Sequence, residues 1–165
     1  MAYTTFFYFM MLIVFFSYVG YIWAKYGVLQ SISQSYYRLP KKMQPLFTLF
    51  CWTFAIPAII VSSTSLMFLA GAAICFVGAA AAYHDSMTSE VHAIGARVGV
   101  IASQLAVFLN YGMWPLNIAF IVISAALYFY YKKKPNYEQK EVWWIEIVAF
   151  LIICLVLGIQ LFGAN

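Results

Sequence analysis

The sequence predicts an all-α protein, a polytopic membrane bundle of six transmembrane helices that forms a single domain over residues 1–165. The first observation behind this prediction is composition. Of the 165 residues, 65% are hydrophobic, 20% aromatic and only 8% charged, whereas a soluble domain is about 45–50% apolar and about 25% charged. The second is a succession of apolar runs, each close to the ~20 residues that cross ~30 Å of hydrocarbon. Both disfavour a soluble enzyme, a nucleic-acid-binding domain and a disordered chain.

One long and one short polar segment separate the first three spans. The first span, residues 4–26, has no basic segment before it and no small-residue cleavage site, so we expect it to be retained. A polar stretch, residues 27–44, follows it. Pro45 suits the first turn of the second span, residues 46–61, and Pro57 is expected to kink that span. Four hydroxyl residues at 62–65 predict a tight turn before the third span, residues 66–83.

A polar link, a turn and a charged loop delimit the last three spans. Residues 84–91 lead into the fourth span, residues 92–111. Residues 112–115 turn the chain into the fifth span, residues 116–131. A charged loop over 132–141 precedes the sixth span, residues 142–162. Six spans of this length use most of the chain, so we expect no separate soluble domain.

The placement of the basic residues favours an even number of spans. All of them lie between the first two spans, near the link between spans three and four, or between the last two. Under the positive-inside rule these connections are cytoplasmic and both termini are non-cytoplasmic. We therefore expect an integral membrane protein, of the bacterial inner (plasma) membrane. The nine basic residues are Lys25, Arg38, Lys41, Lys42, Arg97, Lys132, Lys133, Lys134 and Lys140.

Small residues predict how the helices associate. Close packing of Gly, Ala and Ser drives helix association in lipid. The third span is rich in Ala and Gly, and Gly95, Gly99, Ala102 and Ala106 form one stripe on the fourth. We expect these two spans to form a close antiparallel pair, with a homo-oligomer interface through Gly95 and Gly99 as the alternative. The three cysteines lie within spans in no metal-binding spacing, and are interpreted as packing residues.

Polar groups converge at the expected cytoplasmic ends of the helices. Arg97 and Glu146 are ionisable residues inside spans at similar depth, where they form either a structural ion pair or part of a binding site. With the Ser/Tyr segment before the second span, they predict a cytoplasm-facing polar cavity that binds a lipid or small ligand, or a partner. Polar helix ends are also common to any bundle. The candidate ligand-binding residues are Ser31, Ser33, Tyr36, Tyr37, Arg38, Asp85, His92, Arg97 and Glu146.

The sequence does not favour an enzyme. Only His84 and His92 offer imidazole ligands for a metal, so a three-histidine zinc site cannot form within one chain. We expect no cofactor and no nucleic-acid partner. Two alternatives to ligand binding stay open. One is an intramembrane lipid hydrolase that uses a metal or a serine such as Ser33 or Ser86, and the other is an oligomeric channel or small transporter.

Three segments carry a resemblance to a known group of proteins. They are residues 31–37 (Ser-Ile-Ser-Gln-Ser-Tyr-Tyr), residues 91–96 (Val-His-Ala-Ile-Gly-Ala) and residues 143–146 (Trp-Trp-Ile-Glu). Together they resemble a family of small multi-span membrane proteins of bacteria and phages that has no established activity. The resemblance implies that the Ser/Tyr segment, His92 and Glu146 form one recurring polar set. In outline the chain is also distantly similar to the alkaline ceramidase and progestin-receptor-like superfamily, from which it departs in having six expected spans rather than seven and two histidines rather than three.

Overall fold

The computed structural model describes residues 2–83, 88–134 and 137–163, without the side chains of residues 82, 83 and 88–92. Within these ranges all the regular structure is helical, which confirms the all-α class. The elements are α1 (Ala2–Tyr26), α2 (Ser35–Arg38), a 3₁₀ turn η1 (Lys41–Met43), α3 (Pro45–Ser62), α4 (Ser65–Tyr83), α5 (Thr88–Leu105), a π-helical turn η2 (Ala106–Asn110), α6 (Trp114–Lys132) and α7 (Glu141–Phe162).

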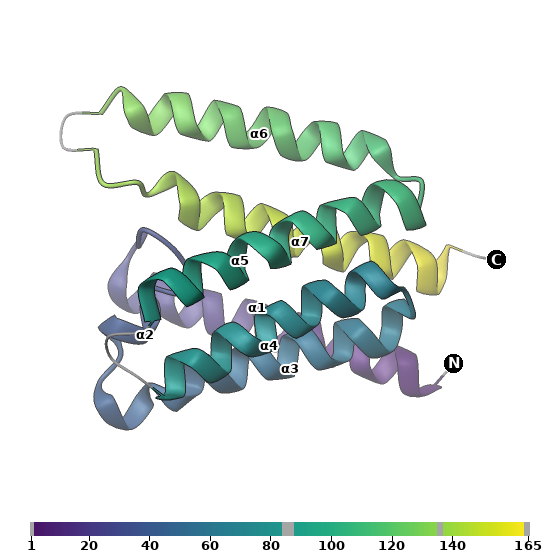
Figure 1. Cartoon of the computed structure of the whole chain (residues 1–165), viewed down its shortest axis with the longest axis horizontal. Coiled ribbons are helices and arrows are strands. Elements are labelled where there is room, and N and C mark those ends of the chain that lie inside the picture. Colours follow the sequence, from purple (N-terminus) through teal and green to yellow (C-terminus); the bar gives the residue numbers. More distant parts are fainter. Residues whose placement is uncertain (1, 84–87, 135–136, 164–165) are drawn as a thin grey trace.

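The long helices run side by side along one axis of the molecule (Figure 1). Neighbours in sequence pack closely, α1 on α3, α3 on α4 and α4 on α5. Helix α7 runs along this group and contacts α1, α3 and α5 more sparsely, while α6 lies at the outer edge and packs chiefly on α7 and η2. The start of α1 and the end of α7 lie at one end of the bundle, and α2 lies at the other (Figure 1).

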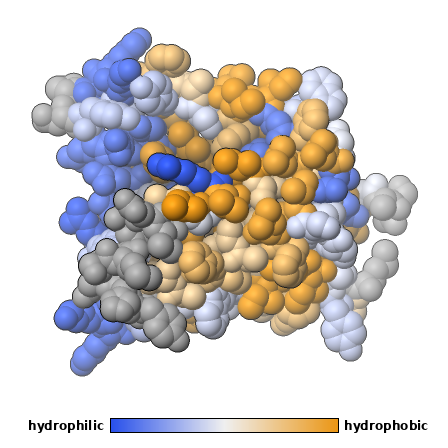
Figure 2. All heavy atoms as spheres, in the orientation of Figure 1, coloured by the Kyte–Doolittle hydropathy of each residue, from blue (hydrophilic) through white to orange (hydrophobic). Residues whose placement is uncertain are grey.

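Five helices are long and apolar enough to cross a membrane, and the chain is therefore an integral membrane protein. They are Ala2–Tyr26, Lys41–Ser62, Ala93–Asn110, Trp114–Lys132 and Glu141–Phe162, while Ser65–Ala81 is a shorter apolar helix. A sixth crossing, by α4, and the sides of the membrane on which the termini lie stay predictions. Figure 2 shows that hydrophilic residues gather at the end of the molecule that carries α2, and that an apolar surface covers much of the rest.

Local sequence features set the helix ends much as expected. Gly27 has a φ of 73° and its N–H donates to the Trp23 carbonyl at 2.9 Å, so a left-handed glycine ends α1. Pro45 occupies the first turn of α3, and Pro57 lies inside that helix without ending it. The fourth expected span differs in two respects. Its helix, α5, begins at Thr88 rather than at 92, and its last turn, η2, is π-helical.

The glycines of the central helices allow backbones to approach closely. A Cβ at Gly78 would lie 2.7 Å from the Cβ of Cys51, and one at Gly95 would lie 2.6 Å from Cγ2 of Val77. Gly78 therefore permits the contact of α4 with α3, and Gly95 permits that of α5 with α4. Gly95 and Gly99 are both buried. Their stripe faces α4, which agrees with the expected close pair of the third and fourth spans.

Candidate functional site

A cavity of about 70 Å³ lies among α3, α4, α5 and α7, beside the connection between α1 and α2. Its wall is almost wholly apolar, and its polar groups are two serines, a buried thiol and one carboxyl. The lining residues are Ile32, Ser33, Phe47, Phe50, Cys51, Ile74, Val77, Ala96, Gly99, Val100, Ser103, Glu146, Ala149, Phe150 and Ile153. The cavity thus combines segments that lie more than 100 residues apart in the sequence.

Glu146 is the one carboxyl among the described residues that line the cavity. It lies in the second turn of α7, and its Oε2 accepts a hydrogen bond from the backbone N–H of Ile32 at 2.6 Å. Its other oxygen has no hydrogen-bond partner among the residues that the structure describes. Carboxyl groups in apolar surroundings are costly unless they are paired or hydrogen-bonded. Glu146 therefore retains unused hydrogen-bonding capacity inside an apolar cavity.

The segment from Leu29 to Leu39 folds back against the bundle and brings Ile32 to Glu146. Leu29, Ile32, Tyr36 and Leu39 are buried. Ser35 is fully buried, and its Oγ lies 2.5 Å from the Ile32 carbonyl and 2.7 Å from the hydroxyl of Tyr18 on α1. These contacts fix the backbone N–H that Glu146 accepts.

Three phenylalanine rings form part of the cavity wall. Phe50 of α3 and Phe150 of α7 have ring centroids 6.0 Å apart, and Phe47 lies 6.5 Å from Phe50. Behind them, the ring of Tyr18 stacks on Phe50 at 4.4 Å. Aromatic pairs of this kind add stability beyond the area that they bury. The rings also present π faces, which attract cations as well as apolar groups.

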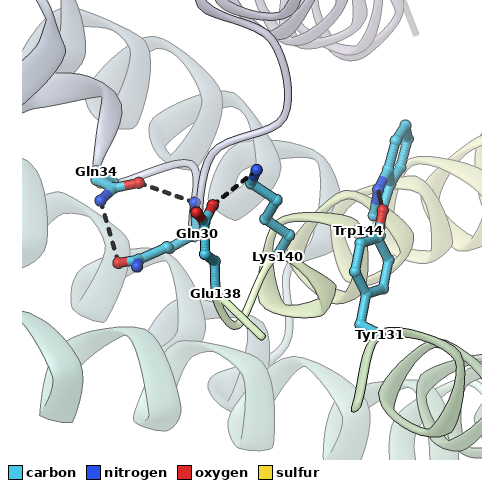
Figure 3. Close-up of polar contacts among 6 residues, drawn as sticks. All are labelled: Gln30, Gln34, Tyr131, Glu138, Lys140 and Trp144. Carbon is cyan, nitrogen blue, oxygen red and sulfur yellow. Dashed lines mark hydrogen bonds and ion pairs between the residues drawn. The ribbon is translucent and has the colours of Figure 1, made fainter. Parts of the chain in front are cut away.

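The connections α1–α2 and α6–α7 meet outside the cavity (Figure 3). The side-chain oxygen of Gln34 accepts the backbone N–H of Gln30 at 2.8 Å, and Lys140 forms an ion pair with Glu138 at 2.7 Å. Gln30, Gln34, Glu138 and Lys140 line one shared groove of about 410 Å³. Further along, Trp144 of α7 donates from Nε1 to the hydroxyl of Tyr131 at the end of α6, at 2.9 Å.

Charges in the α6–α7 connection shift the pKa values of two of its groups. The hydrogen bond and charge of Lys140 lower the pKa of Glu138. The hydrogen bond from Tyr137 to the carboxyl of Glu141 raises the pKa of Tyr137 to about 12. Glu141 is itself buried, and its Oε2 has no hydrogen-bond partner within the described part of the chain. Neither Tyr137 nor Glu138 is among the residues that line the cavity.

The structure brings together only part of the predicted site. Ser33 and Glu146 both line the cavity. Ser31 does not line the cavity but hydrogen-bonds Ser33, with the two Oγ atoms 2.8 Å apart. Arg38 lines the shared outer groove, Tyr36 is buried against Phe47, and Tyr37 is exposed.

Arg97 does not pair with Glu146. Its side chain is exposed, and the ion pair between Glu138 and Lys140 is the one found among the described residues. Ala96 faces the cavity and its neighbour Arg97 does not, because successive residues of a helix point about 100° apart. Of the two roles weighed for Arg97 and Glu146, the shared ion pair is thus not formed.

Several predicted residues lie outside what is described. His84, Asp85 and Ser86 fall in the undescribed link, and the side chain of His92 is likewise not described. Among the described residues, no cluster of three or more His, Cys, Asp or Glu side chains suits a metal ion. The proposals for His84 and His92 therefore stay predictions.

Sequence reasoning missed the apolar wall of the cavity. Phe47, Phe50 and Phe150 lie in spans where most residues are apolar, and periodicity alone does not tell a cavity wall from a lipid-facing surface. Cys51, one of the three cysteines interpreted as packing residues, lines the cavity, and so does Ser103 of α5. These two small polar side chains lie on the faces of α5 and α3 that meet α7. They are the sequence feature that could have indicated the cavity.

No family model matches the chain, and comparisons with curated proteins and with solved structures give no match either. Function is therefore inferred from the chemistry of the cavity.

Proposed function

We propose that this integral membrane protein binds a lipid or small ligand in the cavity beside Glu146, with the carboxyl group as the polar contact that orients the bound group. The observation that carries this proposal is the geometry of Glu146. One oxygen holds the Ile32 N–H at 2.6 Å, and the other has no partner among the described residues. Apolar pockets with a few convergent polar groups are the usual form of small-molecule sites.

The chemistry of the wall favours a hydrogen-bond donor over an anion. A carboxylate accepts hydrogen bonds from ammonium or hydroxyl groups and repels other carboxylates and phosphates. The π faces of Phe47, Phe50 and Phe150 favour a cationic or apolar group over an anionic one. We therefore expect an amine or an alcohol with an apolar body.

The size of the cavity limits what enters it. A cavity of about 70 Å³ is smaller than the roughly 150 Å³ of a dry cavity that accommodates benzene. It therefore takes a small head group, while the rest of the ligand extends outward. Residues of α5 and α7 border the cavity, and these two helices pack far less closely on each other than α4 and α5 do. We infer that the apolar body of the ligand lies along this seam, toward the bilayer.

Three amphiphiles with the same chain and different head groups test the proposal. Dodecylamine, dodecanol and dodecanoate are titrated against the protein in nonionic detergent, and the thermal unfolding midpoint is measured. A ligand that binds only the folded state raises this midpoint. We expect dodecylamine to raise it most, dodecanol less, and dodecanoate not at all beyond its effect on a control membrane protein.

Matched carboxyl variants assign the effect to the cavity. Glu146→Gln keeps an oxygen for the Ile32 N–H but removes the charge, so it should fold and lose most of the response to dodecylamine. Glu138→Gln removes a charge from the exposed α6–α7 connection and should respond as the unmodified protein does. An undiminished response of Glu146→Gln, or an equal response to dodecanoate, would contradict the proposal. The hydrolase and channel alternatives stay predictions that no contact among the described residues specifically favours.

A further inference from the structure

A second depression lies on the outer surface, at the junction of η1 and α3. Its volume is about 630 Å³, and it shares no lining residue with the Glu146 cavity. Lys41, Lys42 and Gln44 line its polar end, and Leu46, Leu49 and Trp52 continue its wall along α3. We call this depression the Lys41–Trp52 groove. It begins at the hydrophilic end of the molecule and extends along a helix that is long and apolar enough to cross a membrane.

Lys41 and Lys42 differ in their surroundings from four other lysines of the chain, which are Lys25, Lys132, Lys134 and Lys140. The ammonium groups of Lys25, Lys132 and Lys134 lie over tyrosine rings, with the closest approach of each between 4.3 and 5.4 Å from a ring centroid. Lys140 is paired with Glu138. Lys41 and Lys42 are exposed, and neither ammonium group pairs with a carboxylate or an aromatic ring among the described residues. Two adjacent positive charges on the groove wall are therefore uncompensated.

The other half of the groove is apolar and follows the helix. Leu46, Leu49 and Trp52 are 39%, 55% and 44% exposed, and their spacing of three residues places them along one side of α3. At 1.5 Å per residue, Trp52 lies roughly 9 Å further along the axis than Leu46. The indole Nε1 of Trp52 donates to the Cys75 carbonyl at 3.0 Å, which holds the ring against α4.

We propose that the Lys41–Trp52 groove binds an anionic phospholipid of the surrounding membrane. The phosphate lies between Lys41 and Lys42, and an acyl chain follows Leu46, Leu49 and Trp52. Lysines near a membrane surface attract anionic lipid electrostatically. The apolar wall distinguishes this ligand from a free phosphate or an acidic peptide, since only a lipid supplies an anionic head and an apolar chain in this order along a membrane-crossing helix.

Native mass spectrometry in nonionic detergent tests the assignment. The probes are a phosphatidylglycerol and a phosphatidylcholine with identical acyl chains, together with glycerol 3-phosphate as the soluble head group. The unmodified protein should retain the first phosphatidylglycerol at least tenfold more tightly than phosphatidylcholine, and glycerol 3-phosphate not measurably. Equal retention of the two lipids, or retention of glycerol 3-phosphate comparable to that of phosphatidylglycerol, would overturn the proposal.

Two double variants with the same loss of charge separate the groove from a general effect of net charge. K41Q/K42Q should weaken retention of the first phosphatidylglycerol by about 10- to 30-fold, as expected for two lysines. K132Q/K134Q, at the same end of the molecule, should weaken it less than threefold. Equal losses in both variants would overturn the proposal. If K41Q/K42Q fails to fold, the salt dependence of lipid retention by the unmodified protein tests the proposal instead. The proposal requires that added salt weaken phosphatidylglycerol retention and leave phosphatidylcholine retention unchanged.

Discussion

Helices α4 and α7 both lie between other helices, but they contact their neighbours in different ways. Helix α4 meets α3 and α5 through glycine and alanine, so that a Cβ at Gly78 would lie 2.7 Å from the Cβ of Cys51. Helix α7 meets the same two helices more sparsely and presents larger side chains, among them Phe150 and Ile153. Small residues allow backbones to approach until no space is left, whereas large side chains of fixed shape leave gaps between them. The cavity lies on the α7 side for this reason.

The largest loss of stability should come from adding a methyl group where α4 and α3 are in close contact. Gly78→Ala should lower the free energy of unfolding by about 3 kcal/mol, because the new methyl group overlaps the Cys51 side chain and displaces the Gly78 carbonyl from Thr48, whose hydroxyl donates to it at 2.8 Å. Denaturation with SDS measures the change. Gly20→Ala is the control, since no described atom outside its chain neighbours and the nearby backbone of α1 lies within 4 Å of its new Cβ. It should stabilise the protein by about 0.5–1 kcal/mol. Equal stability of the two variants would show that α3 and α4 are not in close contact.

The next largest loss of stability concerns the segment from Leu29 to Leu39, which brings Ile32 to Glu146 of α7. Ser35→Ala should cost about 2 kcal/mol, because it leaves the buried hydroxyl of Tyr18 without its partner. It should also loosen Ile32 and thereby weaken the response to dodecylamine. Ser31→Ala, in a half-buried position, should cost less than 1 kcal/mol. SDS denaturation measures the loss of stability, and the shift of the thermal unfolding midpoint measures the response to dodecylamine. Should the two serine variants lose equal stability, Ser35 does not hold the segment.

A smaller effect on stability is expected at Gly99, where the α4–α5 contact borders the cavity beside α7. Gly99 faces α4 and also lines the cavity, and a Cβ there would make ordinary contacts, at 3.5 Å from Ile74 and 3.7 Å from the Ala70 carbonyl. Gly99→Ala should therefore leave stability unchanged or raise it by up to about 1 kcal/mol. It should nevertheless weaken dodecylamine binding by about tenfold, the scale of one methylene in an apolar pocket. Unchanged affinity would mean that the ligand does not reach α5.

The smallest effect concerns the exposed connection that leads into α7. Lys140 lowers the pKa of Glu138, so this pair stabilises the folded protein above the ordinary carboxyl pKa and ceases to do so as the pH falls through the lowered value. Lys140→Gln should raise the pKa of Glu138 toward its ordinary value, as followed by NMR of the carboxyl carbon. The cavity should keep its response to dodecylamine in this variant. A changed response would show that the connection and the cavity are coupled.

The sequence predicted much of the helical pattern because composition, prolines and glycines act locally. The expected spans 4–26, 46–61 and 142–162 lie within α1, α3 and α7, and the aligned glycines of the fourth span predicted its contact with α4. The π-helical turn over Ala106–Asn110 was not predicted, since no proline or glycine marks it. The candidate site was predicted in part. Ser33 and Glu146 reach one cavity, whereas Arg97 points away from it.

The sequence by itself determined that this chain is an integral membrane protein made of helices, because 65% hydrophobic and 8% charged residues leave no other solvent for its surface. It also determined which few polar groups were candidates for function. Only the tertiary structure decided that Glu146 meets the backbone of Ile32 rather than the side chain of Arg97, across 114 positions of the chain. The physical reason is that the rotation of a helix and the path of a connecting segment depend on packing against all their neighbours, which no local pattern records.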